Sequence, residues 1–186
     1  MSTEARDTVS VPFPPTVKLS LTGTTITATG PLGSVRRPFP ADTIALATAN
    51  GVATLTLRIP AKRKRAKALL YTWERHVTNL VGGVTAGVEA KMKIVAAHFP
   101  MKVQVREHTL VIENFLGEKY PRTAPLDPGV SAKVDGEFVI LDGYDVEHVG
   151  QSAANIERTT HIRDYDPRVF QDGIYLIERA HLKEAS

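Results

Sequence analysis

The stretch VKLSLTGTTITATGPLG, residues 17–33, is matched 84 positions later by MKVQVREHTLVIENFLG, residues 101–117. Both stretches alternate apolar and polar residues, carry a threonine at the same place and end in Leu-Gly. Such alternation is typical of β-strands with one solvated face. Self-similarity at a fixed spacing indicates a repeated structural unit, so the sequence predicts two similar lobes.

A second pair of hairpins is expected further along each half. Asn50-Gly51 lies 85 residues ahead of Asp135-Gly136, and each dipeptide stands between two apolar-rich runs. Asn-Gly and Asp-Gly favour two-residue hairpin turns because both residue types tolerate positive φ. In the first half, another hairpin is expected around Gly23-Thr24.

Each half then ends in a helical segment. The first is expected to open at Pro60, because apolar residues between Ala66 and Val81 recur at helical spacing, and to end at Gly82-Gly83. The second is expected to run from an Asp145 N-cap through about Ile162. The sequence therefore predicts an α+β protein of two similar lobes, residues 1–84 and 85–186, each a small antiparallel sheet with one helix packed across it.

Composition restricts the class of protein. The chain has 186 residues, of which 42% are hydrophobic, so both halves can bury a core. It contains no cysteine, which excludes disulfides and thiolate zinc sites. No run approaches the roughly 18 apolar residues of a membrane span, and residues 1–10 lack the apolar core of a signal peptide. We expect a soluble, intracellular protein without a membrane partner.

Charge is distributed unevenly along the chain. Residues 1–84 carry 11 Lys and Arg against 4 Asp and Glu, and residues 85–186 carry 12 against 16, giving +7 and −4. Such polarity lets one lobe face a polyanion, and it is also found in dipolar proteins with no nucleic-acid role. If the second lobe binds RNA, its basic and acidic residues should segregate onto opposite faces.

Catalytic, metal and cofactor sites are not predicted. The six histidines are scattered and form no pair at metal-ligand spacing, and His76 is expected to be a core-facing imidazole of the first helix. The cluster of Asp142, Asp145, Glu147 and His148 suits a turn and helix start better than an acid/base site. Ser152 lacks the second glycine of a nucleophile elbow.

One basic cluster predicts a binding role. Lys62, Arg63, Lys64, Arg65 and Lys67 fall in or near the first turn of a helix, where positive charge opposes the helix dipole at about 0.3–1 kcal/mol each. Phosphates are the natural partners of such a cluster. A solvated helix end or an import signal remains an alternative.

Four ordered blocks carry a family resemblance: HFPMKVQV at 98–105, IENFLGEKYPR at 112–122, GYDVEHVGQSAANI at 143–156 and FQDGIYL at 170–176. Together with the duplication, they resemble the large-subunit ribosomal protein six family in its archaeal and eukaryotic form. The resemblance implies a non-enzymatic structural component that binds the large ribosomal RNA near the sarcin-ricin and translation-factor region. It also implies neighbouring ribosomal proteins, nearby translation factors, a cytoplasmic ribosome, and nucleolar assembly in a eukaryote.

The resemblance also implies which residues of the second lobe meet RNA. Lys119 and Arg122 would neutralise phosphates, Gln151 and Ser152 would hydrogen-bond sugar or phosphate oxygens, and Gly117 would permit close backbone approach. For Leu116-Gly117 a simple hairpin turn remains open. The remaining expected contacts are basic: Arg158, Arg163 and Arg168.

The chain departs from this family at several positions. Family members often have Arg at Glu113, Lys and an aromatic near Ala86 and Val88, and Leu at Gln171. Recognition should rest on phosphate pattern and shape, since aromatic residues make up only 6% of the chain and no base-stacking motif is present. The alternative class is a protein-binding adaptor that uses sheet edges or the acidic surface of the second lobe.

Overall fold

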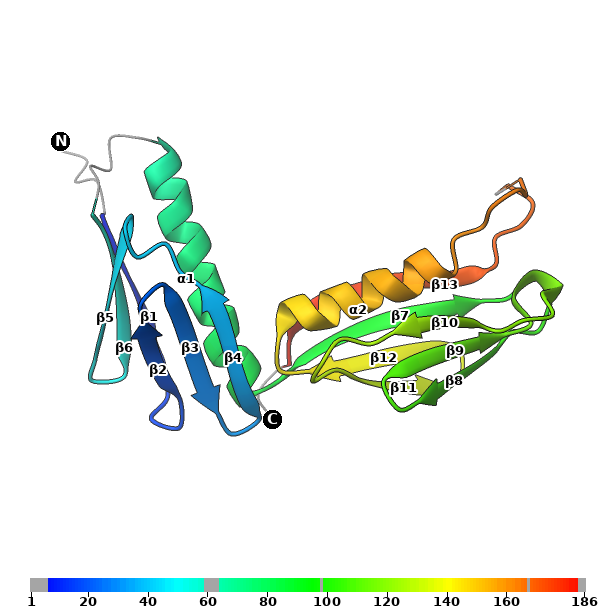
Figure 1. Ribbon diagram of the computed structural model, residues 1–186, viewed down its shortest axis with the longest axis horizontal. Coiled ribbons are helices and arrows are strands. Elements are labelled where there is room, and N and C mark those ends of the chain that lie inside the picture. The colour runs from blue at the N-terminus through cyan, green and yellow to red at the C-terminus, as the bar shows by residue number, and fades with distance from the viewer. Residues whose placement is uncertain (1–6, 59–63, 98, 167, 184–186) are drawn as a thin grey trace. The chain divides into compact units, whose positions relative to one another are not determined.

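The computed structural model describes residues 7–58, 64–97, 99–166 and 168–183. The chain divides into two compact units, Met1–Ala86 and Gly87–Ser186. The boundary predicted after residue 84 falls within the last turn of the first helix, which extends to Thr85. Within the described residues, each unit contains two antiparallel sheets and one long helix (Figure 1). The predicted α+β class with two similar lobes is confirmed, and the structure adds a second sheet to each lobe.

The first unit packs one helix against two three-stranded sheets, ordered β1-β6-β5 and β2-β3-β4. Its elements are β1 (Thr8–Pro12), β2 (Lys18–Thr22), β3 (Thr25–Gly30), β4 (Gly33–Pro38), β5 (Ile44–Ala49), β6 (Val52–Leu57) and α1 (Lys64–Thr85). The two hairpins predicted here are present, with the turns at Gly23-Thr24 and Asn50-Gly51. Gly23, Asn50 and Gly51 all have positive φ, as these tight turns require.

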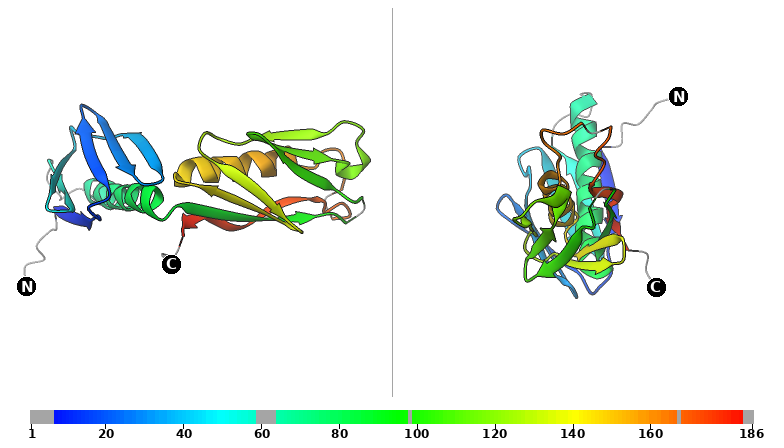
Figure 2. Two further views of the ribbon diagram at one scale, coloured as in Figure 1. Left: turned by 90° about the horizontal axis from the view of Figure 1, so that it is seen from below. Right: turned by 90° about the vertical axis from the view of Figure 1, so that its right-hand side faces the viewer.

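The second unit repeats this arrangement and adds a strand. Its sheets are ordered β10-β9-β8 and β11-β12-β7-β13, and α2 packs across the four-stranded sheet (Figures 1 and 2). Its elements are β7 (Val88–Val95), β8 (Lys102–Arg106), β9 (Thr109–Glu113), the 3-10 segment η1 (Phe115–Gly117), β10 (Arg122–Pro125), β11 (Ser131–Asp135), β12 (Phe138–Gly143), α2 (Val146–Thr159) and β13 (Gly173–Leu182).

The duplication is visible in the strands themselves. β2 begins at Lys18 and β8 at Lys102, which preserves the 84-residue spacing of the two stretches. The predicted Asp135-Gly136 turn is wrong by one residue, because Asp135 pairs with Phe138 and the turn residues are Gly136 and Glu137. Gly136 alone has positive φ there, which fits a turn that requires glycine at its first central position.

The end of α1 differs from the prediction. The helix does not stop at Gly82-Gly83 but continues to Thr85, and Gly87 follows it with φ +87°. A glycine inside a helix costs about 1 kcal/mol, which packing of the surrounding turn can offset. That turn is packed: the amide of Leu32 donates to the Val84 carbonyl at 3.1 Å, and Val84 is buried.

The core of the second unit lies between α2 and the sheets. Its fully buried members include Met92 on β7, Ile112 on β9, Leu141 on β12 and Ile156 on α2. Asp145 caps α2 as predicted, because its carboxylate accepts a hydrogen bond from the Glu147 amide at 2.9 Å. The helix ends at Thr159 rather than near Ile162, and this shorter helix leaves a long loop before β13.

Candidate nucleic-acid interface

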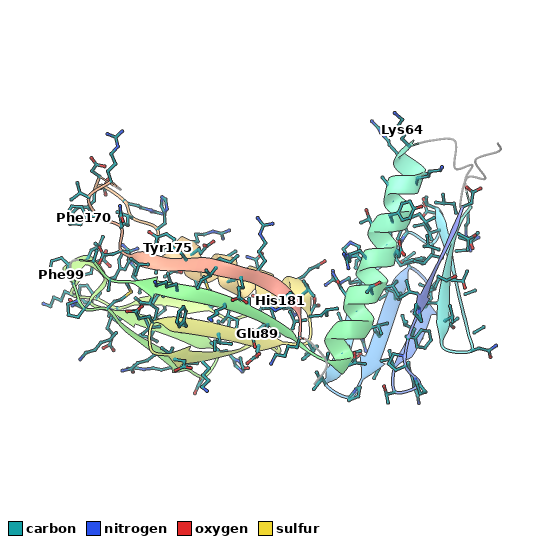
Figure 3. The ribbon with its side chains drawn as sticks, turned by 180° about the vertical axis from the view of Figure 1, so that it is seen from behind. Lys64, Glu89, Phe99, Phe170, Tyr175 and His181 are labelled. Atoms are coloured by element: carbon teal, nitrogen blue, oxygen red, sulfur yellow. The ribbon has the colours of Figure 1, made fainter. Side chains whose placement is uncertain are left out.

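Three loops meet at one end of the second lobe. The loop 96–101 joins β7 to β8, the loop 114–121 joins β9 to β10, and the loop 160–172 joins α2 to β13. Figure 3 shows Phe99 and Phe170, from the first and third loops, at this end, and Glu89 and His181 toward the other end of the same sheet. We call the described residues of these three loops the loop end.

Side-chain hydrogen bonds tie the three loops together. The Asn114 side-chain amide donates to the Pro100 carbonyl at 3.0 Å, which joins the second loop to the first. The Asp172 carboxylate accepts from the Ala97 amide at 2.9 Å, which joins the third loop to the first. Each of these hydrogen bonds joins a side chain of one loop to the backbone of another. Together they hold the three loops in one arrangement.

Arg122 makes the remaining tie, between the second and third loops. Its Nη1 donates to the carbonyls of Thr159 and His161, at 2.7 and 3.1 Å. Its Nε and Nη2 form a fork to the Glu118 carboxylate, at 2.9 and 2.6 Å. The guanidinium also lies 4.2 Å from the centre of the buried Phe115 ring. Only 24% of the Arg122 side chain is exposed.

These contacts give Arg122 a structural role. The hydrogen bond from Arg122, and then its charge, hold the pKa of the Glu118 carboxyl below its usual range, while burial acts in the opposite direction. Glu118 therefore stays ionised and balances the charge of Arg122. The predicted phosphate contact at Arg122 would require the guanidinium to share or release these partners, so we assign it to positioning the loops.

The other basic residues predicted to bind RNA at this end of the lobe are exposed. They come from the second loop, the last turn of α2 and the third loop: Lys119, Arg158, Arg163 and Arg168. Gly117 is also exposed and has φ +76°, a conformation that favours glycine. Leu116-Gly117 belongs to the short η1 segment instead of a simple hairpin turn. The structure thus brings five of the predicted contacts to one end of the lobe.

Gln151 and Ser152 lie apart from this group, in the middle of α2. The Ser152 hydroxyl is fully buried and accepts a hydrogen bond from the Asp127 amide at 2.9 Å. It fixes the segment after β10 against the helix, and we leave it out of the proposed interface. Gln151 is exposed and donates to the Asn155 side chain at 2.9 Å.

The expected segregation of charge is not found at the loop end. Glu118 pairs with Arg122, and Asp164 and Asp166 stand between Arg163 and Arg168, all exposed. The Asp166 carboxylate accepts from the Arg168 amide at 2.9 Å, which shapes the third loop. Acidic residues here therefore serve as loop-forming and pairing groups interspersed with the cations.

The basic cluster of the first lobe is described only in part. Lys62 and Arg63 lie outside the described residues. Lys64 and Arg65 are exposed at the start of α1 and Lys67 is half-buried, and the first turn of the helix contains no acidic residue. Figure 3 shows Lys64 at this helix end. The described cations are thus accessible to a polyanion.

Sequence reasoning missed the aromatic residues of the loop end. Phe99, Tyr120 and Tyr165 are exposed on the three loops, and Tyr175 is exposed just after them, at the start of β13. The low aromatic content of the whole chain, 6%, did not indicate that several aromatic side chains gather at this end. The signal was present in the order of residues, since Tyr120 follows Lys119 and Tyr165 lies between Arg163 and Arg168.

The residues that depart from the family pattern lie in different environments. Glu113 pairs with Arg106 at 3.5 Å, so an arginine there would lose this partner. Val88 is fully buried in the core of the second unit, and the Ala86 amide donates to the Gly82 carbonyl at the end of α1. Gln171 is exposed in the third loop.

Other kinds of site find little support. Within the described ranges, no three His, Cys, Asp or Glu side chains are grouped closely enough to hold a metal ion, and no helix is long and apolar enough to cross a bilayer. His76 is half-buried beside Trp73, with ring centres 5.1 Å apart. Burial, and then the charge of Arg37, lower the pKa of His76.

Comparison with known proteins places these features in one class. Two copies of one α+β module are what this chain shares with a family of ribosomal proteins. The chain belongs to the Ribosomal protein L6 family, whose profile matches residues 13–87 and 99–173, one copy in each lobe. It is a ribosomal structural protein and not an enzyme.

Individual relatives support the same assignment. The chain is 44% identical to the large ribosomal subunit protein uL6 of Methanosarcina mazei over 171 residues, which are 92% of this chain and 96% of that protein. It is 41% identical to the uL6 of Methanobrevibacter smithii over 169 residues, 91% of this chain and 94% of the relative. With the uL6 of Methanococcus vannielii it shares 51% identity over 118 residues, 63% and 65% of the two chains.

Proposed function

We propose that this protein, a component of the large ribosomal subunit, binds large-subunit rRNA through the loop end of its second lobe. The observation that carries the proposal is a set of exposed cations at one end of the lobe, where three loops are tied to one another: Lys119 on the second loop, Arg158 in the last turn of α2, and Arg163 and Arg168 on the third loop. Cations held at fixed spacing can match the phosphate pattern of folded RNA without reading its bases.

The ties decide how the binding works. Loops that were free before binding would lose conformational entropy when RNA fixed them, which weakens affinity. Here Arg122, Asn114 and Asp172 fix the loops beforehand, so the cations need little rearrangement. Arg122 contributes by positioning, and Lys119, three residues earlier and exposed, supplies a free charge.

The resemblance to the family extends the proposal to a place on the subunit. We expect the loop end to contact the sarcin-ricin region, near the translation-factor site, in the cytoplasmic ribosome. Lys64, Arg65 and Lys67 of the first lobe form a second cationic patch that suits rRNA or a neighbouring ribosomal protein. We propose that the lobe of residues 1–84 carries this second patch and that the lobe of residues 85–186 carries the loop end.

The alternative function is a protein-binding adaptor that pairs a partner with an exposed sheet edge. The edge strand β13 gives this alternative little support. That edge is blunted, because the Thr160 hydroxyl accepts from the Ile174 amide at 3.1 Å and the Glu157 carboxylate accepts from the Leu176 amide at 2.8 Å. A strand edge whose amides are already bonded to side chains offers a poor template for another strand.

Binding of purified large-subunit rRNA at several salt concentrations tests the proposal. Replacing Lys119 with Gln should weaken binding and reduce the slope of log K against log salt by about 1, as expected for one lost phosphate contact. Lys18→Gln, an exposed lysine on β2 of the other lobe, is the matched control and should leave the slope unchanged. Equal slopes of log K against log salt for both variants and the wild type would refute the role of Lys119. Salt-insensitive capture of one protein would instead favour an adaptor.

A further inference from the structure

The four-stranded sheet of the second lobe has one face that α2 does not cover. On β7, Ala90 and Met92 are fully buried in the core that α2 shares, so Lys91 and Lys93, which alternate with them, lie on the opposite face. Residues that pair directly in an antiparallel sheet point to the same side. The register of β7 with its two neighbours therefore identifies the other side chains of this uncovered face.

One row of this face crosses three strands. Lys93 pairs with Phe138 on β12 and with Tyr175 on β13. Neighbouring strands lie about 4.8 Å apart, so the Cα atoms of Phe138 and Tyr175 are about 10 Å apart, with the lysine between them. Lys93 and Tyr175 are exposed, and Phe138 is half-buried. We call Lys91, Lys93, Phe138 and Tyr175 the sheet patch.

The ring of Tyr175 is held in a fixed position. Its hydroxyl donates to the carbonyls of Gln171 and Asp172, at 3.2 and 3.4 Å. A Cβ added at Gly173 would lie 2.8 Å from Cζ and 2.9 Å from both Cε2 and Oη of Tyr175, so this end of the ring lies over the glycine. The strand thus supports the ring from one side, and 46% of Tyr175 remains exposed (Figure 3). A fixed, exposed ring is a stacking platform for a nucleobase.

The two lysines supply positive charge along the middle of the sheet patch. They alternate with core residues on β7 and so stand about 7 Å apart along the strand. The Lys91 ammonium lies 4.5 Å from the centre of the Phe138 ring, and this cation–π contact holds it in place. Lys91 also pairs in register with Glu178, which offsets part of its charge. Both register partners of Lys93 are aromatic, so Lys93 is the principal cation of the patch.

The distribution of charge on this face favours a polyanion near the loop end. Toward the other end of the sheet, Glu89 and Asp142 pair in register, and Lys183 lies 3.8 Å from the first and 2.6 Å from the second. Two carboxylates share one ammonium there, which disfavours phosphate. Tyr175, by contrast, lies just after the third loop, which carries two of the exposed loop-end cations. An RNA segment bound at the loop end can therefore continue onto the sheet patch.

We propose that the sheet patch binds unpaired nucleotides of RNA, with a base stacked on Tyr175 and the adjoining phosphates at Lys93 and Lys91. Single-strand recognition commonly combines cations that follow the backbone with an aromatic platform for the bases. Stacking accepts every base, so the patch should not select a sequence. The proposal rests on the proposed rRNA-binding function and deepens it, because it adds an unpaired segment to the phosphate contacts of the loop end.

Fluorescence anisotropy of labelled hexauridylate with the full-length protein tests the sheet patch without rRNA. A hexameric oligomer of ribose phosphates that lacks the bases is the control probe and should bind more weakly. Tyr175→Ala should weaken the binding of hexauridylate by about 5- to 150-fold, the loss expected for one stacked base. Tyr71→Ala, which removes a similarly exposed ring from α1 of the other lobe, should leave the affinity unchanged.

Two further variants keep the test decisive if Tyr175→Ala fails to fold. Tyr175→Phe should bind hexauridylate like the wild type, because stacking needs the ring and not the hydroxyl. Lys93→Gln should reduce the slope of log K against log salt by about 0.7, the value for one phosphate contact with a single strand. Lys102→Gln, an exposed lysine on β8 in the other sheet of the same lobe, should leave the slope unchanged.

Two results would overturn the proposal. One is equal affinity for hexauridylate and the base-free oligomer, which would show that no base stacks. The other is wild-type binding of hexauridylate by both Tyr175→Ala and Lys93→Gln, which would leave a protein as the candidate partner of this face.

Failure of this proposal can be separated from failure of the rRNA-binding function. If hexauridylate binding does not depend on the sheet patch but rRNA binding still depends on Lys119, the patch proposal is wrong and the general function stands. If hexauridylate binding depends on the patch but rRNA binding does not depend on the loop-end cations, the phosphate surface of the loop end is wrong instead.

Discussion

At the scale of single residues, Arg122 stands out because its contacts within the protein support the proposed binding surface. Four hydrogen bonds and a ring contact engage its guanidinium within the protein. Arg122→Ala should lower the free energy of unfolding by about 1–3 kcal/mol, because the Glu118 carboxylate and two carbonyls lose their donor. Arg122→Lys should recover only part of this, since a lysine cannot form the planar fork.

Chemical denaturation of the two variants provides the measurement. Arg163→Ala, at an exposed position of the third loop, should stay within about 0.5 kcal/mol of the wild type. If Arg122→Lys is as stable as the wild type, the fork and its carbonyl contacts do not hold the loops.

His76 predicts a pH dependence of the first lobe. Burial and Arg37 lower its pKa in the folded protein, so the unfolded chain binds the proton more readily than the folded one. Stability should therefore be unaffected well above pH 6.5 and should fall as the pH drops from about 6.5 toward the lower, folded pKa. Denaturation at pH 8 and pH 5 should show a smaller loss for His76→Gln; an equal loss would contradict this origin.

At the scale of elements, helix packing can be tested with two glycines, one beside the end of α1 and one within α2. An added Cβ at Gly30 on β3 would lie 2.6 Å from a Val84 methyl and 2.7 Å from the Val84 carbonyl oxygen. Gly30→Ala should therefore destabilise the protein by about 1–3 kcal/mol through overpacking.

Gly150 provides the opposite case within α2. No heavy atom lies within 4 Å of an added Cβ there, so alanine should stabilise the helix by about 0.5–1 kcal/mol. Thermal or chemical unfolding of both variants measures the pair. If Gly30→Ala is neutral, or if Gly150→Ala destabilises, the packing described for these helices is incorrect.

Local patterns predicted most elements because the information was local. The Asn50-Gly51 turn, the Asp145 cap and the apolar stripe of α1 follow from neighbouring residues. β13 was missed, although it runs from Gly173 to Leu182. Its later positions include the exposed Glu178, Arg179 and His181, so the sequence there does not alternate between apolar and polar residues in a clear pattern. The described part of the first unit has no strand after its helix, so the repeat did not predict β13 either.

For the candidate site, the sequence identified exposed basic residues but did not reveal which side chains are engaged within the protein. Lys119, Arg163 and Arg168 are exposed as a binding function requires. The family motif placed Ser152 and Arg122 among the RNA contacts. In the structure, the Ser152 hydroxyl accepts from the Asp127 amide, and Arg122 donates to the carbonyls of Thr159 and His161, all far away in the sequence. Contacts between segments far apart in the chain decide such roles, and one sequence does not reveal them.

For the whole molecule, duplication explains how a chain of this size can act as a scaffold. Each lobe builds its own core beneath one helix, so loops can diverge without loss of the fold. The second lobe adds β13 after its helix, and the loop between α2 and β13 carries Arg163 and Arg168. We propose that the loop end is the principal attachment of this protein to the large subunit.

Sedimentation of ribosomes from cells that express a tagged copy tests this attachment most directly. Wild-type protein and the Lys18→Glu control should sediment with the large subunit. The triple variant Lys119→Glu, Arg163→Glu, Arg168→Glu should remain at the top of the sucrose gradient. A cooperative thermal unfolding transition of the purified triple variant should show that it is still folded. Incorporation of the triple variant at the wild-type level would contradict the claim that the loop end holds this protein on rRNA.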